Sequence, residues 1–278
     1  MEVNEYAQAR PSPALRPYVS HYSGYRQRGL PPRQHRGLPS PYLTLILTID
    51  DPLVVAAHPD HRQAPGRYDA LIGGLHLTPA TIEQGGQQSG VQVAVNPLGC
   101  RALFGLPAGE LANVDTDLAA VAGGAVVSQL RERLRLEATW PARFAALDDM
   151  LCRLARFREA EVHPDVVHVF RRLLAAGGNV PVGALAAEVG WSARHLTNRF
   201  RAEVGLRPKE AARVARFDRA RRRLAPGVRL SDVAAASGYF DQAHLAREFR
   251  AFAGCSPSRW KADEIDFVQA QAVFADED

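Results

Sequence analysis

The chain has 278 residues, of which 46% are hydrophobic and 23% are charged, and its formal net charge is +4. This length predicts two domains, and the composition is typical of a soluble globular protein. No apolar run approaches the ~18 residues of a membrane-spanning helix, and the Pro- and Arg-rich start does not resemble a secretory signal. The cysteines Cys100, Cys152 and Cys255 are isolated and form no CxxC pair. We therefore expect a cytoplasmic protein without disulfides, zinc cluster or membrane contact.

Charge divides the chain into a basic part and an acidic part. Residues 165–264 hold 18 basic and 10 acidic residues, whereas the remainder holds 16 basic and 20 acidic residues. A compact basic domain indicates a polyanionic partner, most often nucleic acid, and the alternative is a solvated basic surface. Residues 266–278 form an acidic tail, for which we expect no packed structure.

The N-terminal region predicts a β-rich domain after an irregular start. Residues 1–40 show no sustained hydrophobic period, which indicates an arm and at most an edge strand. Short apolar, β-branched segments bounded by Pro, Gly or Asp follow at Tyr42–Ile49, Leu53–Ala57, Tyr68–Leu75 and Gly90–Val95. Such strands and turns predict a β-sandwich or barrel.

A helical period replaces the strand pattern near residue 118. Leu118–Leu136 predicts one amphipathic helix, and Thr139 and Pro141 suit the cap and first turn of a second helix that extends to about residue 158. The two helices either cover the sheet or form a hairpin for dimer contacts, and the pattern does not separate these two roles.

The sequence offers little support for an enzyme. His58, Asp60, His61, His76 and Glu83 are candidate metal ligands, but they lack the HxH spacing typical of a barrel metal site. No nucleophile with a base, paired carboxylates or dinucleotide-binding glycine pattern is evident. We therefore predict no catalytic residues, no metal and no cofactor. A cupin-type enzyme fused to the basic domain remains an alternative, which stoichiometric bound metal would support.

The basic region contains an internal repeat. The segment that begins at Leu185 and the segment that begins at Val233 align at an offset of 48 to 49 residues. In each copy a glycine precedes an aromatic residue, a His-Leu pair and a Phe-Arg pair follow, and a Gly-to-Pro spacing of three ends the unit. The matched pairs include Gly190 with Gly238, His195 with His244, and Phe200 with Phe249.

The physical properties of each copy predict a helix-turn-helix. In the first copy a short Ala-rich helix, Val182–Val189, ends at Gly190, which permits a tight turn, and Ser192 is suited to cap a second helix. On that helix Leu196 and Phe200 are expected to face the core with Ala193, and the opposite stripe carries Arg194, Thr197, Asn198 and Arg201. Long hydrogen-bonding side chains on an exposed stripe suit a major-groove recognition helix.

The second copy follows a connecting helix. Pro208–Leu224 predicts one helix with an arginine-rich side, which would fix the distance between the two units. Ser231 is a candidate cap of the next helix, and a second recognition helix is expected to begin near Asp241. Two matched copies on a basic background are much stronger evidence than one.

These motifs resemble the AraC/XylS family of bacterial transcription regulators. The resemblance covers about a hundred residues, from His163 to Lys261, and includes Gly238-Tyr-Phe, His244-Leu and Ser256-Pro-Ser-Arg-Trp260. More weakly, Pro13-Ala-Leu-Arg-Pro-Tyr18 and residues 90–105 resemble the cupin-like sensor domains of such regulators. The resemblance implies an α+β fold with a cupin-like domain and helical hairpin at 1–160, an all-α double helix-turn-helix domain at 161–265, and the acidic tail at 266–278.

The resemblance also implies the DNA-binding residues and the partners. Base contacts would fall at Arg194, Thr197, Asn198, Gln242, Ala243, Ala246 and Arg247, and phosphate contacts at Ser192, Arg201, Arg222 and Arg250. The two alanines offer only apolar contact, such as with a thymine methyl group. Expected partners are double-stranded DNA, an unidentified small-molecule effector, a second copy of the chain and RNA polymerase. A constitutive DNA-binding regulator whose first domain only dimerises is the alternative within this class.

Overall fold

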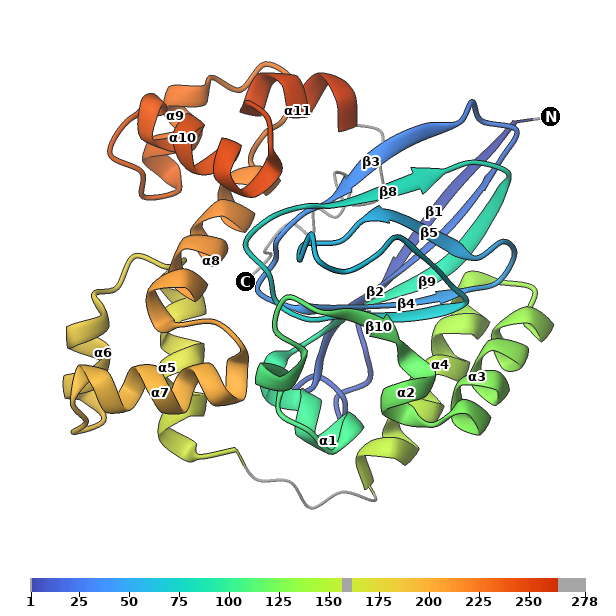
Figure 1. Cartoon of the computed structure of the whole chain (residues 1–278), viewed down its shortest axis with the longest axis horizontal. Helices are drawn as coiled ribbons and strands as arrows, with labels where there is room; N and C mark the ends of the chain where they lie inside the picture. The colour runs from blue at the N-terminus through green and yellow to red at the C-terminus, as the bar shows by residue number, and fades with distance from the viewer. Residues whose placement is uncertain (1, 157–161, 265–278) are drawn as a thin grey trace.

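The computed structural model describes residues 2–156 and 162–264 (Figure 1). A β-rich region with flanking helices is followed by a region of helices alone, which confirms the predicted fold class. The expected boundary at residue 160 and the expected acidic tail, 266–278, lie outside the described residues. None of the described helices is long and apolar enough to cross a membrane.

The strands form two antiparallel sheets. The larger has the order β1-β2-β9-β4-β7-β10 and the smaller the order β3-β8-β5-β6. Ile46 and Leu71 of the larger sheet pack against Leu53, Val55 and Ile82 of the smaller, so the sheets form a sandwich. The strands are β1 (Val3–Ala9), β2 (Val19–Arg28), β3 (Arg33–Gly37), β4 (Leu43–Thr48), β5 (Leu53–Ala57), β6 (Gly66–Tyr68), β7 (Ala70–Gly73), β8 (Ala80–Gln84), β9 (Gln87–Val95) and β10 (Asp115–Asp117).

The expectation of an arm at residues 1–40 is wrong, because three strands lie there. These strands lack an apolar alternation because polar side chains line the inner face of this half of the sandwich. The hydroxyl of Tyr6 donates to Ser23 Oγ at 3.2 Å, and Gln27 Nε2 donates to Asn4 Oδ1 at 3.1 Å. Ser23 and Gln27 are both buried. The strands are thus stabilised by hydrogen bonds that a hydrophobic pattern does not reveal.

Helices cover the outer face of the larger sheet. A short 3₁₀ segment and helix, η1 (Pro97–Gly99) and α1 (Cys100–Phe104), follow β9, and η2 (Ala108–Leu111) precedes β10. The helix expected at Leu118–Leu136 is split into α2 (Leu118–Ala122) and α3 (Gly124–Leu136), because Gly123 has a φ of +93°. Helix α4 (Trp140–Arg156) returns alongside α3, as Figure 1 shows. Buried side chains of α3 and α4 pack into the same core as the sheet: Val127, Leu130, Leu134, Phe144, Leu147 and Leu151.

The C-terminal region consists of helices that pack around buried aromatic residues. Phe217 of α8 lies 5.0 Å, between ring centroids, from both Phe249 and Phe252. The two repeat copies fold as α6 with α7 and α9 with α10, and α8 connects them, as predicted. The helices are α5 (Pro164–Ala175), α6 (Val182–Glu188), α7 (Ala193–Val204), α8 (Pro208–Arg222), α9 (Leu230–Ala236), α10 (Gln242–Ala253) and α11 (Pro257–Glu264).

Two local expectations in this region are wrong. Ser231 does not cap α9, because Arg229 occupies the cap position and the helix begins at Leu230, so that Ser231 already lies within it. Ala193 does not face the core with Leu196 and Phe200, because it is the first residue of α7 and lies exposed beside the cap.

The two regions contact each other at the C-terminal end of α7. Arg101 of α1 donates two hydrogen bonds to Glu203 of α7, at 2.8 and 2.9 Å. Beside this pair, η2 approaches α7 so closely that a Cβ added to Gly109 would lie 2.2 Å from the carbonyl oxygen of Ala202. The first repeat unit is therefore in direct contact with the β-rich domain.

Candidate nucleic-acid interface

The first repeat unit has the geometry of a helix-turn-helix. Gly190 has a φ of +67° in the turn between α6 and α7, which a side chain would strain. Ser192 Oγ then accepts a hydrogen bond from the backbone N–H of His195 at 3.2 Å and caps α7. Leu196 and Phe200 are fully buried, so this side of α7 is fixed against the domain core. The opposite side of α7 faces outward.

The outward side of α7 carries the predicted DNA-contacting residues. Arg194, Asn198 and Arg201 are exposed and Thr197 is half-buried. The Thr197 hydroxyl donates its proton to the carbonyl of Ala193 at 2.8 Å. Thr197 can therefore contact a partner through its methyl group or accept a hydrogen bond on its oxygen. Arg194 and Asn198 retain long side chains with several donors, which suits them to the edges of guanine and adenine.

The second unit repeats this arrangement with a different cap. Asp241 accepts a hydrogen bond from the backbone N–H of His244 at 2.6 Å and caps α10. Leu245 and Phe249 are fully buried, as expected. On the outward side Gln242, Ala243, Arg247 and Arg250 are exposed and Ala246 is half-buried.

The aromatic residue that follows each glycine supports its recognition helix. In the first unit the Trp191 ring lies 4.6 Å from the His195 ring at an edge-on angle of 90°. In the second, Tyr239 lies 5.2 Å from His244 at 87°. The same contact in both copies shows that Tyr239, rather than the next residue, is the counterpart of Trp191. The repeat is therefore present in the structure as well as in the sequence.

The connecting helix α8 uses its arginines for contacts within the protein. Arg213 makes a bidentate pair with Glu248 of α10, with both distances at 2.9 Å. Arg216 donates to the carbonyl of Gly178 at 3.0 Å. These contacts hold α8 against α10 of the second unit and against the loop that follows α5, so these two arginines do not form a solvated basic face.

A buried carboxylate on α8 organises two further arginines. Asp218 is only 5% exposed and lies 2.8 Å from both Arg221 and Arg222. Burial alone would raise the pKa of Asp218, but the two guanidinium groups hold the pKa below its ordinary value. The predicted phosphate contact Arg222 therefore lies in an ion pair here, and it reaches a phosphate only if this pair opens. The three- and four-residue spacing of Asp218 to Arg221 and Arg222 on one helix indicates such ion pairs in the sequence itself.

The same arginines border a small space between the two domains. Arg221, Arg222 and Asp218 line it from α8, and His21 and Tyr42 line it from the β-rich domain. Burial first, and the charge of Arg222 second, lower the pKa of His21 to about 4. The charged side of α8 thus faces the N-terminal domain.

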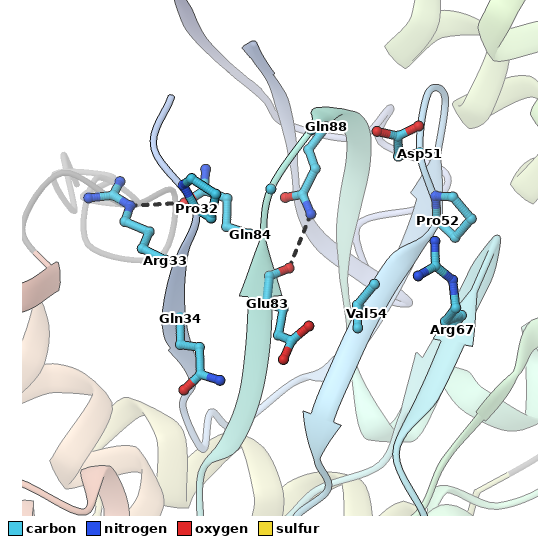
Figure 2. Close-up of a pocket in the computed structure, with 12 residues that line it drawn as sticks. Pro32, Arg33, Gln34, Asp51, Pro52, Val54, Arg67, Glu83, Gln84 and Gln88 are labelled. Carbon is cyan, nitrogen blue, oxygen red and sulfur yellow. Dashed lines mark hydrogen bonds between the residues drawn. The ribbon is translucent and has the colours of Figure 1, made fainter. Parts of the chain in front are cut away.

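A groove of the described N-terminal domain lies on the smaller sheet (Figure 2). Its volume of about 630 Å³ is within the range of small-molecule sites. Figure 2 shows charged side chains of both signs along it: Arg33, Asp51, Arg67 and Glu83. A space between the two sheets, bordered by Leu53, Val55 and Leu71, has a volume of only about 40 Å³. The groove is therefore the roomier of these two spaces.

The histidines considered as metal ligands do not come together. His58 is fully buried, and its Nδ1 lies 2.8 Å from Asp115 Oδ2, while its Nε2 lies 3.3 Å from the Tyr68 hydroxyl. His76 Nδ1 contacts the carbonyl of Thr78 at 2.6 Å. Within residues 2–156 and 162–264 no three His, Cys, Asp or Glu residues are arranged to hold a metal ion.

Comparisons with known proteins match both halves of the chain. Residues 185–263 match a family described as a helix-turn-helix domain, and residues 7–117 match a domain of unknown function (DUF6597). No curated protein matches the chain. Among solved structures, ToxT from Vibrio cholerae O395 is similar at 9% identity, with a TM-score of 0.50 over 91% of this chain and 98% of that chain.

ToxT from the same strain has also been solved with a ligand. The structure bound to (E)-4-(8-methylnaphthalen-1-yl)but-3-enoic acid is similar to this chain at 10% identity, with a TM-score of 0.51 over 89% of this chain and 98% of that chain. At these identities the likeness shows the fold. It extends over both the β-rich domain and the helical domain.

Proposed function

We propose that this protein, whose C-terminal domain is an AraC-type helix-turn-helix domain, is a sequence-specific transcription regulator that responds to a small molecule. The observation that carries the proposal is the pair of capped helices, α7 and α10, each with one side buried and a polar or basic side exposed. A rigid connecting helix joins them, so both helices can enter successive major-groove segments of one duplex.

Each unit is assigned a set of DNA contacts. Base contacts are assigned to Arg194, Thr197 and Asn198 in the first unit. In the second unit they are assigned to Gln242, Ala243, Ala246 and Arg247. Phosphate contacts are assigned to Ser192, Arg201 and Arg250, all of which are exposed. Arg222 joins this set only in a state in which its pair with Asp218 has opened.

Selection of bound fragments from genomic DNA tests the proposal directly. We expect the full chain to enrich a motif with two short blocks, one for each unit. Binding should weaken steeply as salt is raised, because each phosphate neutralised by arginine releases counterions. Equal enrichment of all fragments, or an affinity that does not change between low and moderate salt, would contradict sequence-specific binding.

The effector is assigned to the groove on the smaller sheet. Its size is suitable and its lining carries both charges, so a polar small molecule is the matching class. The ligand-bound ToxT structure shows a small molecule bound to a protein of similar fold, which supports this assignment. A thermal-shift screen against a metabolite panel tests this, because a ligand that binds only the folded state raises the unfolding midpoint. No shift with any metabolite would favour a constitutive regulator.

The N-terminal domain is assigned a sensing role and no catalysis. His58 Nδ1 pairs with Asp115 and its Nε2 lies 3.3 Å from the Tyr68 hydroxyl, so both ring nitrogens have partners within the domain. We further propose that the protein forms a homodimer through residues 118–154 and contacts RNA polymerase. Light scattering of the full chain and of residues 163–261 tests the dimer, and we expect a dimer and a monomer respectively. A monomeric full chain would remove this role from α3 and α4.

A further inference from the structure

Phe240 is the most exposed large hydrophobic side chain of the described residues, at 93% exposure. It lies in the turn of the second unit, between Tyr239 and the cap Asp241. We propose that Phe240 is a specificity-determining residue that makes an apolar contact with a thymine methyl group at the edge of the major groove entered by α10. This inference rests on the proposed DNA-binding function and adds a residue to it.

The two turns differ by one residue, and that residue is Phe240. In the first unit Trp191 is followed at once by the cap Ser192, whereas in the second unit Phe240 stands between Tyr239 and Asp241. Tyr239 and Trp191 make the same contact with a histidine, so the aromatic support is complete without Phe240. The added residue therefore has no counterpart in the fold of the first unit.

The backbone around Phe240 is held firmly although its side chain is not buried. Tyr239 is only 5% exposed, and its backbone N–H donates to the carbonyl of Ala234 at 2.9 Å. The backbone N–H of Phe240 donates to His244 Nδ1 at 3.4 Å, and Asp241 caps the helix. A turn fixed on both sides holds the Cα of Phe240 in place, so the backbone loses little ordering entropy when the ring meets a partner.

The position of the ring selects DNA as the partner. In a helix-turn-helix the N-terminal residues of the recognition helix contact base edges, and Phe240 lies two residues before the first residue of α10. The adjoining stripe carries Ala243 and Ala246, which contact bases only through apolar groups. Phe240 precedes these alanines by three and six positions and adds a large apolar group to the same end of the unit, and the thymine C5-methyl is the apolar group that the major groove offers.

Substitution of Phe240 tests the inference on the motif that the wild-type chain selects. We expect Phe240→Ala to fold normally, because the ring is exposed, and to bind the selected site about tenfold more weakly. The slope of affinity against salt should not change, because phenylalanine neutralises no phosphate. Val228→Ala, another exposed apolar residue of the same domain, is the matched control and should bind as the wild type does.

Uracil-substituted DNA identifies the contact itself. Replacing thymines by uracil in the half-site of the second unit removes only methyl groups, and we expect it to weaken wild-type binding more than binding by Phe240→Ala, which keeps only the contacts of Ala243 and Ala246. Equal affinity of wild type and Phe240→Ala would overturn the inference, as would a loss of transcription with unchanged DNA binding, which would assign the ring to a protein partner. If the wild type selects no motif, the proposed function fails first, so the two failures are distinguishable.

Discussion

We propose that sequence readout by the first unit depends mainly on Arg194 and Asn198. Both are exposed on α7 and both have side chains able to make bidentate contacts with a base. The second unit has alanine at two of its four assigned base contacts, so its hydrogen-bonding readout depends on Gln242 and Arg247. The first unit should therefore specify more of the motif through hydrogen bonds than the second.

Substitution of Arg194 tests this division. We expect Arg194→Ala to lose about 1–3 kcal/mol of binding free energy on the selected site and to relax one base position. Gln242→Ala should widen the motif less. Selection of DNA fragments with each variant measures both effects. A motif that survives Arg194→Ala but is lost with Gln242→Ala would show instead that the second unit dominates.

His21 is predicted to make the stability of the folded chain depend on pH. Its folded-state pKa is about 4, mainly because of burial, whereas its ordinary pKa is about 6.5. Between these values the unfolded chain takes up a proton that the folded chain does not, so the free energy of unfolding should fall as the pH is lowered from about 6.5 to about 4. Urea unfolding of His21→Gln should show a shallower fall than the wild type. Identical pH profiles would mean that His21 is solvated in solution.

At the scale of elements, the sequence predicted the helix-turn-helix units well because several signals agree there. Gly190, the caps Ser192 and Asp241, and the paired Leu and Phe of each recognition helix all specify the same local structure. The strands β4, β5 and β9 were also predicted, because apolar residues lie on both of their faces. By contrast, β1, β2 and β3 carry polar side chains toward the sandwich interior, and hydrophobic pattern alone does not distinguish them from an arm.

The contacts between distant elements were beyond a reading of the sequence. Arg101 and Glu203 are 102 positions apart, and nothing in the local pattern of either residue indicates the other. The position of Arg222 between the domains shows the same limit. The spacing of Asp218 to Arg222 indicates an ion pair on α8, but the sequence does not show that this pair borders a space with His21 and Tyr42 of the β-rich domain.

Asp218 is predicted to be the main electrostatic support of the connecting helix. Asp218→Asn would remove the buried carboxylate that pairs with both Arg221 and Arg222, which we expect to lower the free energy of unfolding by about 3–5 kcal/mol. Asp232→Asn, which breaks an exposed pair with Arg229, is the control and should cost much less than Asp218→Asn. Urea unfolding of both variants measures the difference. Equal values would show that the buried pair adds nothing beyond a surface pair.

At the scale of the whole molecule, the contact between η2 and α7 joins the proposed sensor to the first recognition helix. The backbones approach each other at Gly109, and the Arg101–Glu203 pair lies beside them. The contact is at the C-terminal end of α7, whereas Arg194 and Asn198 lie nearer its N-terminal end. The N-terminal domain therefore holds the helix without covering its predicted base-contacting residues.

Gly109→Ala should separate the two domains without unfolding either of them. Its φ is not positive, so the backbone accepts alanine, but the new Cβ would lie 2.2 Å from the carbonyl oxygen of Ala202 and 2.9 Å from that of Arg201. Backbone atoms of a capped helix cannot yield cheaply at that distance, so η2 and α7 must move apart. Coupled domains unfold together and uncoupled domains unfold separately.

We therefore expect calorimetry to show one unfolding transition for the wild type and two for Gly109→Ala. The midpoints of the two transitions of Gly109→Ala should resemble those of residues 163–261 alone and of the N-terminal domain alone. Gly124→Ala is the matched control, because a Cβ there meets no other atom within 4 Å, and it should keep a single transition. A single transition at an unchanged midpoint for Gly109→Ala would mean that the domains do not stabilise each other through this contact. In that case a signal from the effector groove would have to reach α7 by another route, and the Asp218 side of α8 is one further contact between the domains that could carry it.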